Sequence, residues 1–242
     1  MKIKVGINGM GRIGRMILRS IIENNNNIEI KHINNRSSSE ACSNLLKYDS
    51  IHGKFNAEVD FDSNHLVINK NKISFSQETD LDNINWKKFD VDYVFECTGK
   101  FNSKDKLLPH LKNGAKKVIV SAPCKNADKT IVFGVNEADL KKEDDIISAA
   151  SCTTNCLAPV AHVLNKNFEI EKAFMTTIHA FTSDQRILDN SPCLTVKEVG
   201  FTAVNQCALP SAPFMERSLI KLLVTSFRTI MSLMECSKFD RE

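Results

Sequence analysis

Short apolar runs alternate with segments of helical periodicity along the first 150 residues. Residues 2–8 alternate apolar and polar positions and stop at a glycine, which predicts a strand. Residues 12–23 repeat isoleucine and methionine near helical spacing and predict a helix, and residues 28–34 predict a second strand. Together these three segments form one βαβ unit, whose crossover we expect to be right-handed.

The alternation continues toward the middle of the chain. Further strands are predicted at residues 55–60, 65–68, 72–75, 91–96, 115–120, 130–133 and 145–148. Helices are predicted at 104–113 and 152–168, and a strand at 172–179. Strands that alternate with helices favour an α/β fold with a mostly parallel sheet covered on both faces. Residues 191–213 show no clear period, and 214–234 form at most an amphipathic stripe.

Composition excludes several classes of protein. Of the 242 residues, 42% are hydrophobic and 25% charged, which is typical of folded domains and excludes a disordered or collagen-like chain. The net charge of +3 (32 basic minus 29 acidic residues) is too small to favour a nucleic-acid or membrane partner. The sequence also shows neither an apolar signal segment nor a membrane span. We therefore expect a cytoplasmic protein.

Eight cysteines occur, too few for a disulfide scaffold of this length. Because C-x-x-C spacing is absent, we expect no metal site and assign the thiols to a reducing compartment. Cys152 lies at the predicted start of a helix, where the helix dipole favours the nucleophilic thiolate. His179 ends the next predicted strand and is a partner for covalent catalysis. The alternative from spacing alone is a buried thiol and a structural histidine.

A glycine motif directly follows the first predicted strand and opens the first helix. Gly9, Gly11 and Gly14 have the spacing that gives a tight turn, a close approach of backbone to pyrophosphate, and tight helix packing. This context predicts a dinucleotide site at the helix N-terminus. The second strand ends in Asn35 and Arg36 rather than in an acidic residue. Asn35 can bond a ribose hydroxyl and Arg36 can pair with a 2′-phosphate, or Arg36 is a solvated loop residue.

Several segments closely resemble the phosphorylating glyceraldehyde-3-phosphate dehydrogenases. They are residues 5–15, 47–53, 97–99, 121–123, A-S-C-T-T-N-C at 150–156 and T-I-H-A-F-T at 177–182. The resemblance is collinear from about residue 1 to residue 191. It implies a Rossmann-type doubly wound parallel sheet in residues 1–150, with 151–191 as the start of an α+β catalytic domain that is incomplete here.

The resemblance also implies a mechanism. Cys152 attacks the aldehyde of glyceraldehyde 3-phosphate, His179 activates the thiol, hydride passes to NAD or NADP, and inorganic phosphate cleaves the resulting thioester to an acyl phosphate. This reaction belongs to glycolysis and gluconeogenesis. Three residues match positions that hold substrate or attacking phosphate: Ser151, Thr153 and Thr182. Five match positions along the dinucleotide: Arg12, Ile13, Thr98, Gly99 and Ser121.

Two departures from the family pattern affect these expectations. The family's NAD-binding aspartate matches Asn35, so we expect NADP to be accepted beside NAD. The resemblance also stops after Ser191, and residues 192–242 contain none of the family's later phosphate-binding, nicotinamide-holding or subunit-contact segments. A truncation or frameshift explains such a break. We therefore expect a poor or inactive enzyme, and we do not carry the family's homotetramer over to this chain.

Two other functions stay open. Erythrose-4-phosphate dehydrogenase shares the fold and the cysteine, although segments 121–123 and 180–182 look more like the glyceraldehyde-3-phosphate enzymes. A non-catalytic dinucleotide-binding remnant is the alternative from a different class, because much of the catalytic domain is not recognisable. Turnover of the two aldehydes separates the enzymes, and cofactor binding without acyl-phosphate formation marks the remnant.

Overall fold

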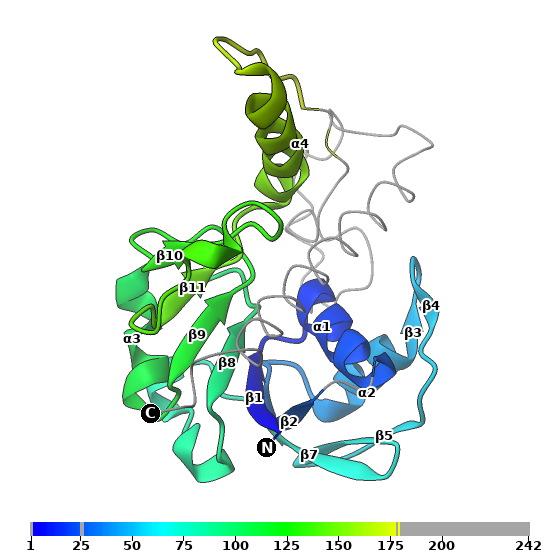
Figure 1. Ribbon diagram of the computed structural model, residues 1–242. Helices are drawn as coiled ribbons and strands as arrows, with labels where there is room; N and C mark the ends of the chain where they lie inside the picture. Colours follow the sequence, from blue (N-terminus) through cyan, green and yellow to red (C-terminus); the bar gives the residue numbers. More distant parts are fainter. Residues whose placement is uncertain (1, 25–26, 178, 180–242) are drawn as a thin grey trace, which may run out of the picture.

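A nine-stranded sheet dominates the computed structural model, which describes residues 2–24, 27–177 and 179 (Figure 1). The strand order is β10-β11-β9-β8-β1-β2-β7-β6-β5. The strands are β1 (Ile3–Asn8), β2 (Ile28–Asn34), β5 (Val59–Asp62), β6 (His65–Ile68), β7 (Asn71–Ser76), β8 (Tyr93–Glu96), β9 (Lys117–Val120), β10 (Lys129–Thr130) and β11 (Ile146–Ser148). Pairing is parallel from β10 to β7 and antiparallel only through β6 and β5. The predicted mostly parallel α/β sheet is confirmed.

Helices cover both faces of this sheet. Helices α1 (Arg12–Glu23) and α2 (Ser39–Lys47) lie on one face and α3 (Lys104–Lys112) on the other (Figure 1). A short hairpin, β3 (Tyr48–Asp49) and β4 (Gly53–Lys54), follows α2, and three 3₁₀ turns lie at Leu81–Asn83, Lys87–Phe89 and Glu137–Asp139. Helix α4 (Cys152–Phe168) follows β11 and extends away from the sheet (Figure 1).

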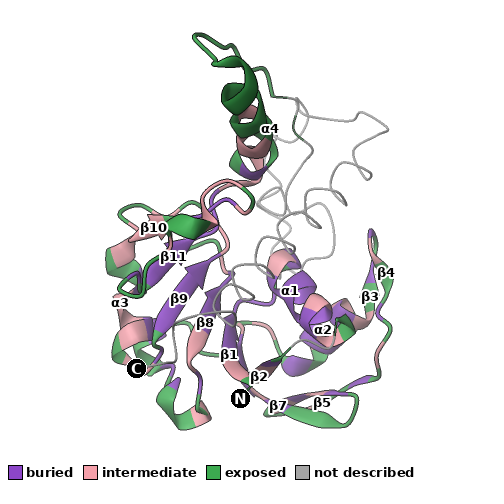
Figure 2. Ribbon diagram, in the orientation of Figure 1, coloured by how far each residue is buried: buried purple, intermediate pink, exposed green. Residues whose placement is uncertain are grey.

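The core lies between the sheet and its helices. Central strand residues such as Val5, Ile7, Val94 and Ile119 are at most 1% exposed. Figure 2 shows this burial along β1, β8 and β9, whereas α4 is largely exposed. Parallel strands that are buried on both faces have nearly continuous apolar sequences, and this is why these segments could be predicted from the sequence. In the described part of the chain, no helix is both long and apolar enough to span a bilayer.

Several predicted bounds agree with the structure and others move. Helices 12–23 and 152–168 and strands 28–34 and 65–68 have the predicted bounds. The strand predicted at 55–60 forms instead at Val59–Asp62, because Phe55 bonds the end of α2 through its backbone N–H to the Lys47 carbonyl (2.9 Å). The strand predicted at 130–133 is only β10, because the Val132 N–H bonds the side chain of Asn136 and the chain turns.

Two predictions about elements need correction. Helix α2 has no counterpart among the predicted elements; Ser38 caps it by accepting a hydrogen bond from the Ala41 N–H (3.2 Å). The strand predicted at 172–179 is wrong for the described residues 172–177 and 179, which form no strand. Its apolar side chains lie outward, with Phe174 fully exposed. A strand needs a hydrogen-bonded neighbour, and none is described beside this segment.

Candidate active site

The glycine loop between β1 and α1 forms a cradle over the helix N-terminus. Gly9 has φ +97°, a conformation that side chains disfavour, and Gly11 is the N-cap of α1. A Cβ on Gly14 would lie 2.0 Å from the Gly9 carbonyl oxygen, so only glycine lets helix and loop pack this closely. A Cβ on Gly11 would meet nothing within 4 Å. The space above Gly11 is therefore open for a ligand's pyrophosphate, and these residues fit a dinucleotide.

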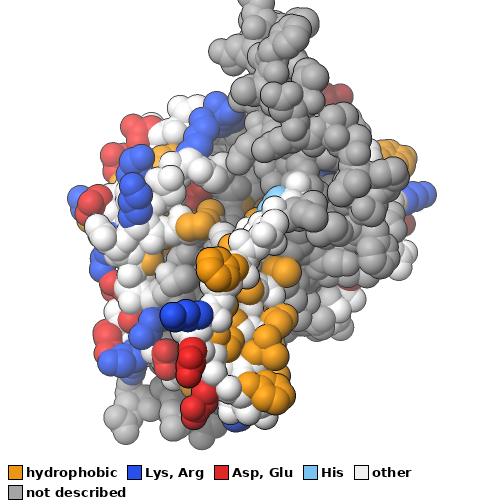
Figure 3. Space-filling view, turned by 90° about the horizontal axis from the view of Figure 1, so that it is seen from above, with side chains coloured by type: hydrophobic (Ala, Val, Ile, Leu, Met, Phe, Trp, Pro, Cys, Tyr) orange, Lys and Arg blue, Asp and Glu red, His pale blue; other side chains and the backbone are white. Residues whose placement is uncertain are grey.

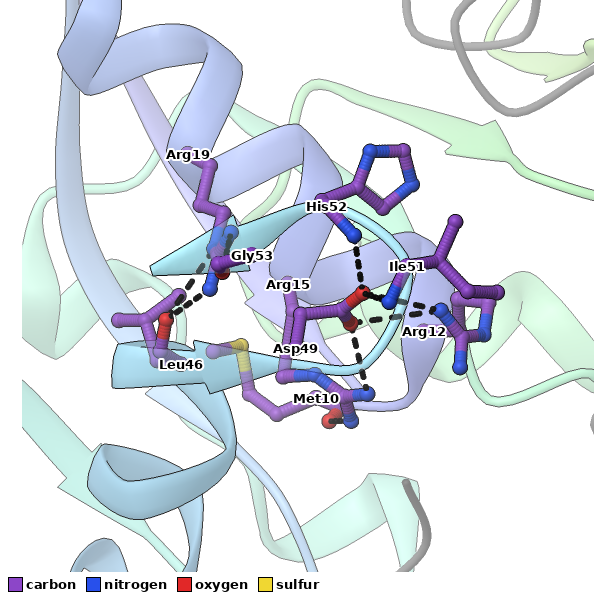
Figure 4. A network of polar contacts seen from close by, with 9 residues as sticks. All are labelled: Met10, Arg12, Arg15, Arg19, Leu46, Asp49, Ile51, His52 and Gly53. Carbon is purple, nitrogen blue, oxygen red and sulfur yellow. Dashed lines mark hydrogen bonds and ion pairs between the residues drawn. The ribbon is translucent and has the colours of Figure 1, made fainter. Parts of the chain in front are cut away.

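Arginines of α1 attach the β3–β4 hairpin to this helix (Figure 4). Arg12 Nη1 lies 3.3 Å from Asp49 Oδ2, and Arg15 Nη2 lies 3.7 Å from the same oxygen. The backbone N–H groups of Ile51 and His52 also donate to Asp49. Burial of Asp49 opposes ionisation, but these backbone hydrogen bonds and Arg12 outweigh it and hold the pKa of the carboxyl below its usual value.

The Asp49 contacts bear on two predicted site residues, Arg12 and Ile13. The Arg12 side chain is buried and engaged by Asp49. Its backbone N–H and that of Ile13 belong to the first turn of α1, where N–H groups lack intrahelical partners. The first turn of a helix suits an anion, so the prediction for these two residues concerns their backbone, whereas the Arg12 side chain is held by Asp49 of the β3–β4 hairpin.

Asn35 supports the glycine loop from the end of β2. Its Oδ1 accepts a hydrogen bond from the Met10 N–H (3.0 Å), and its Nδ2 donates to the Cys42 sulfur (3.2 Å). Burial raises the pKa of Cys42 to about 11, with the Asn35 hydrogen bond acting in the opposite direction, so this sulfur is a neutral thiol at physiological pH. Arg36 follows on the surface and is exposed. The structure thus brings Asn35 to the loop and leaves the Arg36 side chain in solvent.

Thr98, Gly99 and Ser121 lie where β8 and β9 end beside β1. The Thr98 N–H donates to the Glu96 side chain (2.8 Å), and the Ser121 N–H donates to the Glu96 carbonyl (3.0 Å). Gly99 turns the chain with φ +72°. The chain order reverses between β1 and β8, since β2 lies on one side of β1 and β8 on the other. Ligands of doubly wound sheets bind at this switch point.

Cys152 opens α4 and faces His179. Its Sγ lies 3.0 Å from His179 Nε2. The side chain is half-buried, which opposes ionisation, but the hydrogen bond and charge of His179, with smaller contributions from Thr153, outweigh burial and lower the pKa of the thiol. The helix N-terminus adds a positive dipole end at the same place. The predicted pairing of this cysteine with this histidine is therefore present, and it has the geometry of an activated nucleophile.

The residues around Cys152 fix the start of α4. Ser151 caps the helix by accepting a hydrogen bond from the Thr154 N–H (3.0 Å). Ala150 has φ +60°, a strained conformation for alanine that turns the chain between β11 and the helix. Asn155 is buried and donates to the carbonyls of Ala149 (2.8 Å) and Ser151 (2.9 Å). The strained turn is thus held from inside the helix. Thr182 lies outside the described residues.

Comparison with known sequences identifies the family that the motifs resemble. The sequence model of the glyceraldehyde 3-phosphate dehydrogenase NAD-binding domain matches residues 3–104, and that of the C-terminal domain of the same family matches residues 151–199. The chain belongs to the glyceraldehyde-3-phosphate dehydrogenase family. It is 49% identical over 191 residues to glyceraldehyde-3-phosphate dehydrogenase 2 of Bacillus subtilis, and 46% identical over 187 residues to the glyceraldehyde-3-phosphate dehydrogenase of Thermotoga maritima. These alignments cover 78% and 77% of this chain and 56% of each relative, so the chain spans about half the length of the curated relatives it matches.

Three residues with clear roles at the site were not among the predicted site residues. Asp49 binds two arginines of α1, Glu96 binds Thr98, and Asn155 holds the turn before Cys152. Asn155 lies within the family-like segment 150–156. An asparagine inside a helix, four residues after a serine N-cap, is a sequence signal that could have identified it. Asp49 lies within the family-like segment 47–53, but its arginine partners are more than 30 residues away. Glu96 also bonds Asn8, which is 88 residues away, and no local pattern marks that contact.

Proposed function

We propose that this chain carries the dinucleotide site and the nucleophile of a phosphorylating glyceraldehyde-3-phosphate dehydrogenase. The substrate is glyceraldehyde 3-phosphate, the cofactor NAD or NADP, and the product an acyl phosphate. The observation that carries the proposal is the 3.0 Å contact between Cys152 Sγ and His179 Nε2 at the start of α4, in a chain that also holds an open glycine cradle.

The chemistry begins at Cys152. His179 takes the thiol proton, and the thiolate forms a bond to the aldehyde carbon while the carbonyl π electrons move to oxygen. His179 then returns the proton to that oxygen, which gives a thiohemiacetal. In the next step His179 takes the hydroxyl proton again, so the C–H electron pair can leave as hydride. A bound dinucleotide supplies the hydride acceptor for this oxidation, which leaves a thioester on Cys152.

Phosphate completes the reaction. An oxygen of inorganic phosphate attacks the thioester carbon, the C–S bond breaks, and the thiolate of Cys152 is restored as the acyl phosphate leaves. Ser151 and Thr153 flank the sulfur and present hydroxyl groups beside the N-terminus of α4. We assign the binding of phosphate oxygens to these two residues, because a helix N-terminus with adjacent hydroxyls suits an anion.

Cofactor choice is proposed to be relaxed. Asn35 replaces an acidic selector, and its side chain is already engaged with Met10 and Cys42. A neutral amide does not repel a 2′-phosphate, and the exposed Arg36 next to it is available to pair with one. The loop of Gly9 and Gly11, packed on the helix at Gly14, holds the pyrophosphate in either case, and Thr98, Gly99 and Ser121 line the nicotinamide side of the site.

The test uses the purified 242-residue chain. NAD and NADP are titrated separately, and phosphate-dependent oxidation is followed with glyceraldehyde 3-phosphate and with erythrose 4-phosphate. We expect both dinucleotides to bind with affinities within about 100-fold of one another, and an Asn35→Asp variant to shift the preference toward NAD. Preferential turnover of erythrose 4-phosphate overturns the substrate assignment. If the chain binds a dinucleotide but forms no acyl phosphate, even in a single turnover, its assignment as an enzyme is overturned. It is then a dinucleotide-binding protein without this activity.

A further inference from the structure

Glu96 is a buried carboxyl group at the end of β8. It is 1% exposed, and no lysine or arginine of the described residues pairs with it. Four donors reach its two oxygens instead. Oε2 accepts from Asn8 Nδ2 (2.6 Å) and His110 Nε2 (3.1 Å), and Oε1 accepts from both the N–H (2.8 Å) and the hydroxyl of Thr98. The four acceptor positions of a carboxylate are therefore filled.

The proton on His110 is fixed by Trp86. The indole Nε1 of Trp86 lies 2.9 Å from His110 Nδ1, and an indole N–H can only donate. Nδ1 is therefore an unprotonated acceptor, and the single ring proton of His110 is on Nε2, directed at Glu96. A doubly protonated His110 would bring two hydrogens together between the two rings. The histidine is thus neutral, and the contact with Glu96 is a hydrogen bond from a neutral donor.

The orientation of Asn8 is fixed by a second chain of contacts. The Glu78 N–H donates to Asn34 Oδ1 (2.8 Å), so Asn34 Nδ2 is the atom that donates to Asn8 Oδ1 (2.8 Å). Asn8 Nδ2 is then the group that faces Glu96. On the other oxygen, the Lys100 N–H donates to the Thr98 hydroxyl (3.2 Å), which turns the hydroxyl hydrogen toward Glu96. Backbone and indole N–H groups therefore determine every donor in the network.

These four donors exclude the neutral acid form of Glu96. A protonated carboxyl group has a hydrogen to donate, and all four neighbours present hydrogens of their own. The ionised form satisfies all of them. A neighbouring thiol is affected as well: burial and then the Glu96 charge raise the pKa of Cys97, which is next in sequence.

The network lies directly beneath the glycine cradle. Asn8 immediately precedes Gly9, and the Gly9 N–H donates to the Asn34 carbonyl (2.8 Å). The Thr98 nitrogen would be 2.8 Å from a Cβ on Gly9, so the two loops are packed against each other. We infer that Glu96 is a buried carboxylate anion and the positioning residue that fixes the Thr98 backbone against the glycine loop. Only the expected effect on dinucleotide affinity rests on the proposed function; the charge of Glu96 and its contact with Thr98 do not.

The decisive variant is Glu96→Gln, tested in the full chain against the unmodified protein. Glutamine has nearly the same volume, but its NH₂ group replaces one carboxylate oxygen. This group then faces either the two donors of Thr98 or those of Asn8 and His110. One fixed N–H, from Thr98 or from His110, then loses its acceptor. We expect the affinity for the dinucleotide to fall by about 10- to 100-fold, the effect of losing hydrogen bonds to a charged group. The exchange rate of the Thr98 amide hydrogen is expected to rise where the NH₂ group takes the position of Oε1.

Asp128→Asn is the matched control. Asp128 also accepts two backbone hydrogen bonds, from Asp145 (3.1 Å) and Ile146 (2.9 Å), and pairs with Lys104. These contacts lie at the start of β11, at the opposite end of the strands from the cradle. The same carboxylate-to-amide change is expected to leave the Thr98 exchange rate unchanged and the dinucleotide affinity within about twofold. Equal loss in both variants overturns a positioning role and indicates general destabilisation.

A measurement on the unmodified protein does not depend on any variant folding. Long-range proton–nitrogen NMR correlations report which nitrogen of His110 carries the proton. We expect a neutral ring protonated on Nε2. A doubly protonated ring, or a proton on Nδ1, overturns the inference, as does a Glu96→Gln protein that binds dinucleotide as tightly as the parent. If the parent binds no dinucleotide, the proposed function fails, and the His110 and Thr98 measurements then decide on Glu96 alone.

Discussion

The sheet and helix α4 contain the same kinds of apolar residues in different surroundings. Val94 in β8 is fully buried, whereas Val163 in α4 is 57% exposed and Phe168 at the end of that helix is 78% exposed. The only buried residue of α4 is Asn155. Seen from the top of Figure 1, apolar side chains form a band across the described surface (Figure 3). The sheet is therefore held by packing, and α4 by its local cap and its backbone hydrogen bonds.

This difference explains which segments the sequence could predict after Cys152. A helix satisfies its backbone within one segment, and Ser151 supplies a cap, so α4 has the predicted bounds even though its apolar side chains are exposed. A strand satisfies its backbone only on a neighbour. Residues 172–177 have strand-like composition and form no strand. After Cys152, local signals were therefore enough for the helix and not for the strand.

The largest effect is expected at Gly14, where helix α1 meets the sheet. Gly14→Ala forces a Cβ to within 2.0 Å of the Gly9 carbonyl oxygen, and backbone cannot yield cheaply. We expect a loss of about 3 kcal/mol or more in the free energy of unfolding, measured with urea. Gly11→Ala is the control, because its Cβ meets nothing; it should cost less than about 1 kcal/mol and still weaken dinucleotide binding. Equal stability of the two variants would contradict the packing argument.

The next effect is a pH dependence of stability that arises at His32 in β2. His32 is fully buried between β7 and Phe89, and burial, with a smaller contribution from Lys88, lowers its pKa to about 4 from 6.5. Between these values the unfolded chain binds the extra proton, so stability is lost as the pH falls through this window. This shift in pKa corresponds to a loss of about 3 kcal/mol in the free energy of unfolding in total, of which about 2 kcal/mol is lost between pH 7.5 and pH 5.

A His32→Gln variant provides the comparison for this pH dependence. It cannot titrate, so its unfolding free energy should change far less between pH 7.5 and pH 5 than that of the parent. Carboxylates whose pKa is lowered, such as Asp49 and Asp128, lose their contribution only below about pH 4 and do not overlap this window. An identical pH dependence in the variant and the parent would show that His32 is not the group responsible.

A smaller effect is expected at the reactive end of α4. Because His179 lowers the pKa of Cys152, His179→Asn should slow alkylation of Cys152 near pH 7 by about tenfold. Cys156, exposed on the same helix, serves as an internal control whose labelling rate should not change. In the parent, Cys152 should label far faster than Cys42, which is buried and has its pKa raised to about 11. Peptide mapping by mass spectrometry gives all three rates.

The local structure around the candidate site could be predicted from the sequence where the signal was short-range. Gly9 and Gly14 lie at the expected turn and helix start, and Cys152 opens α4, because turns and caps are short-range features. Asp49 and Glu96 were not predicted as site residues. Their partners Arg12 and Asn8 are 37 and 88 residues away in the chain, and only the fold brings such buried polar groups together. Polar networks under a loop depend on tertiary contacts, which one sequence does not display.

The smallest effect is expected at Val163 in α4, and the same isosteric change at Val94 in the sheet provides the direct comparison. Val94→Thr puts a hydroxyl into the core without a partner and should cost about 2 kcal/mol in the free energy of unfolding. Val163→Thr keeps the branched side chain, and its hydroxyl stays in water, so the change should be within about 0.5 kcal/mol. Urea unfolding of both variants supplies the measurement. A loss at Val163 as large as that at Val94 would show that this face of α4 is covered in solution.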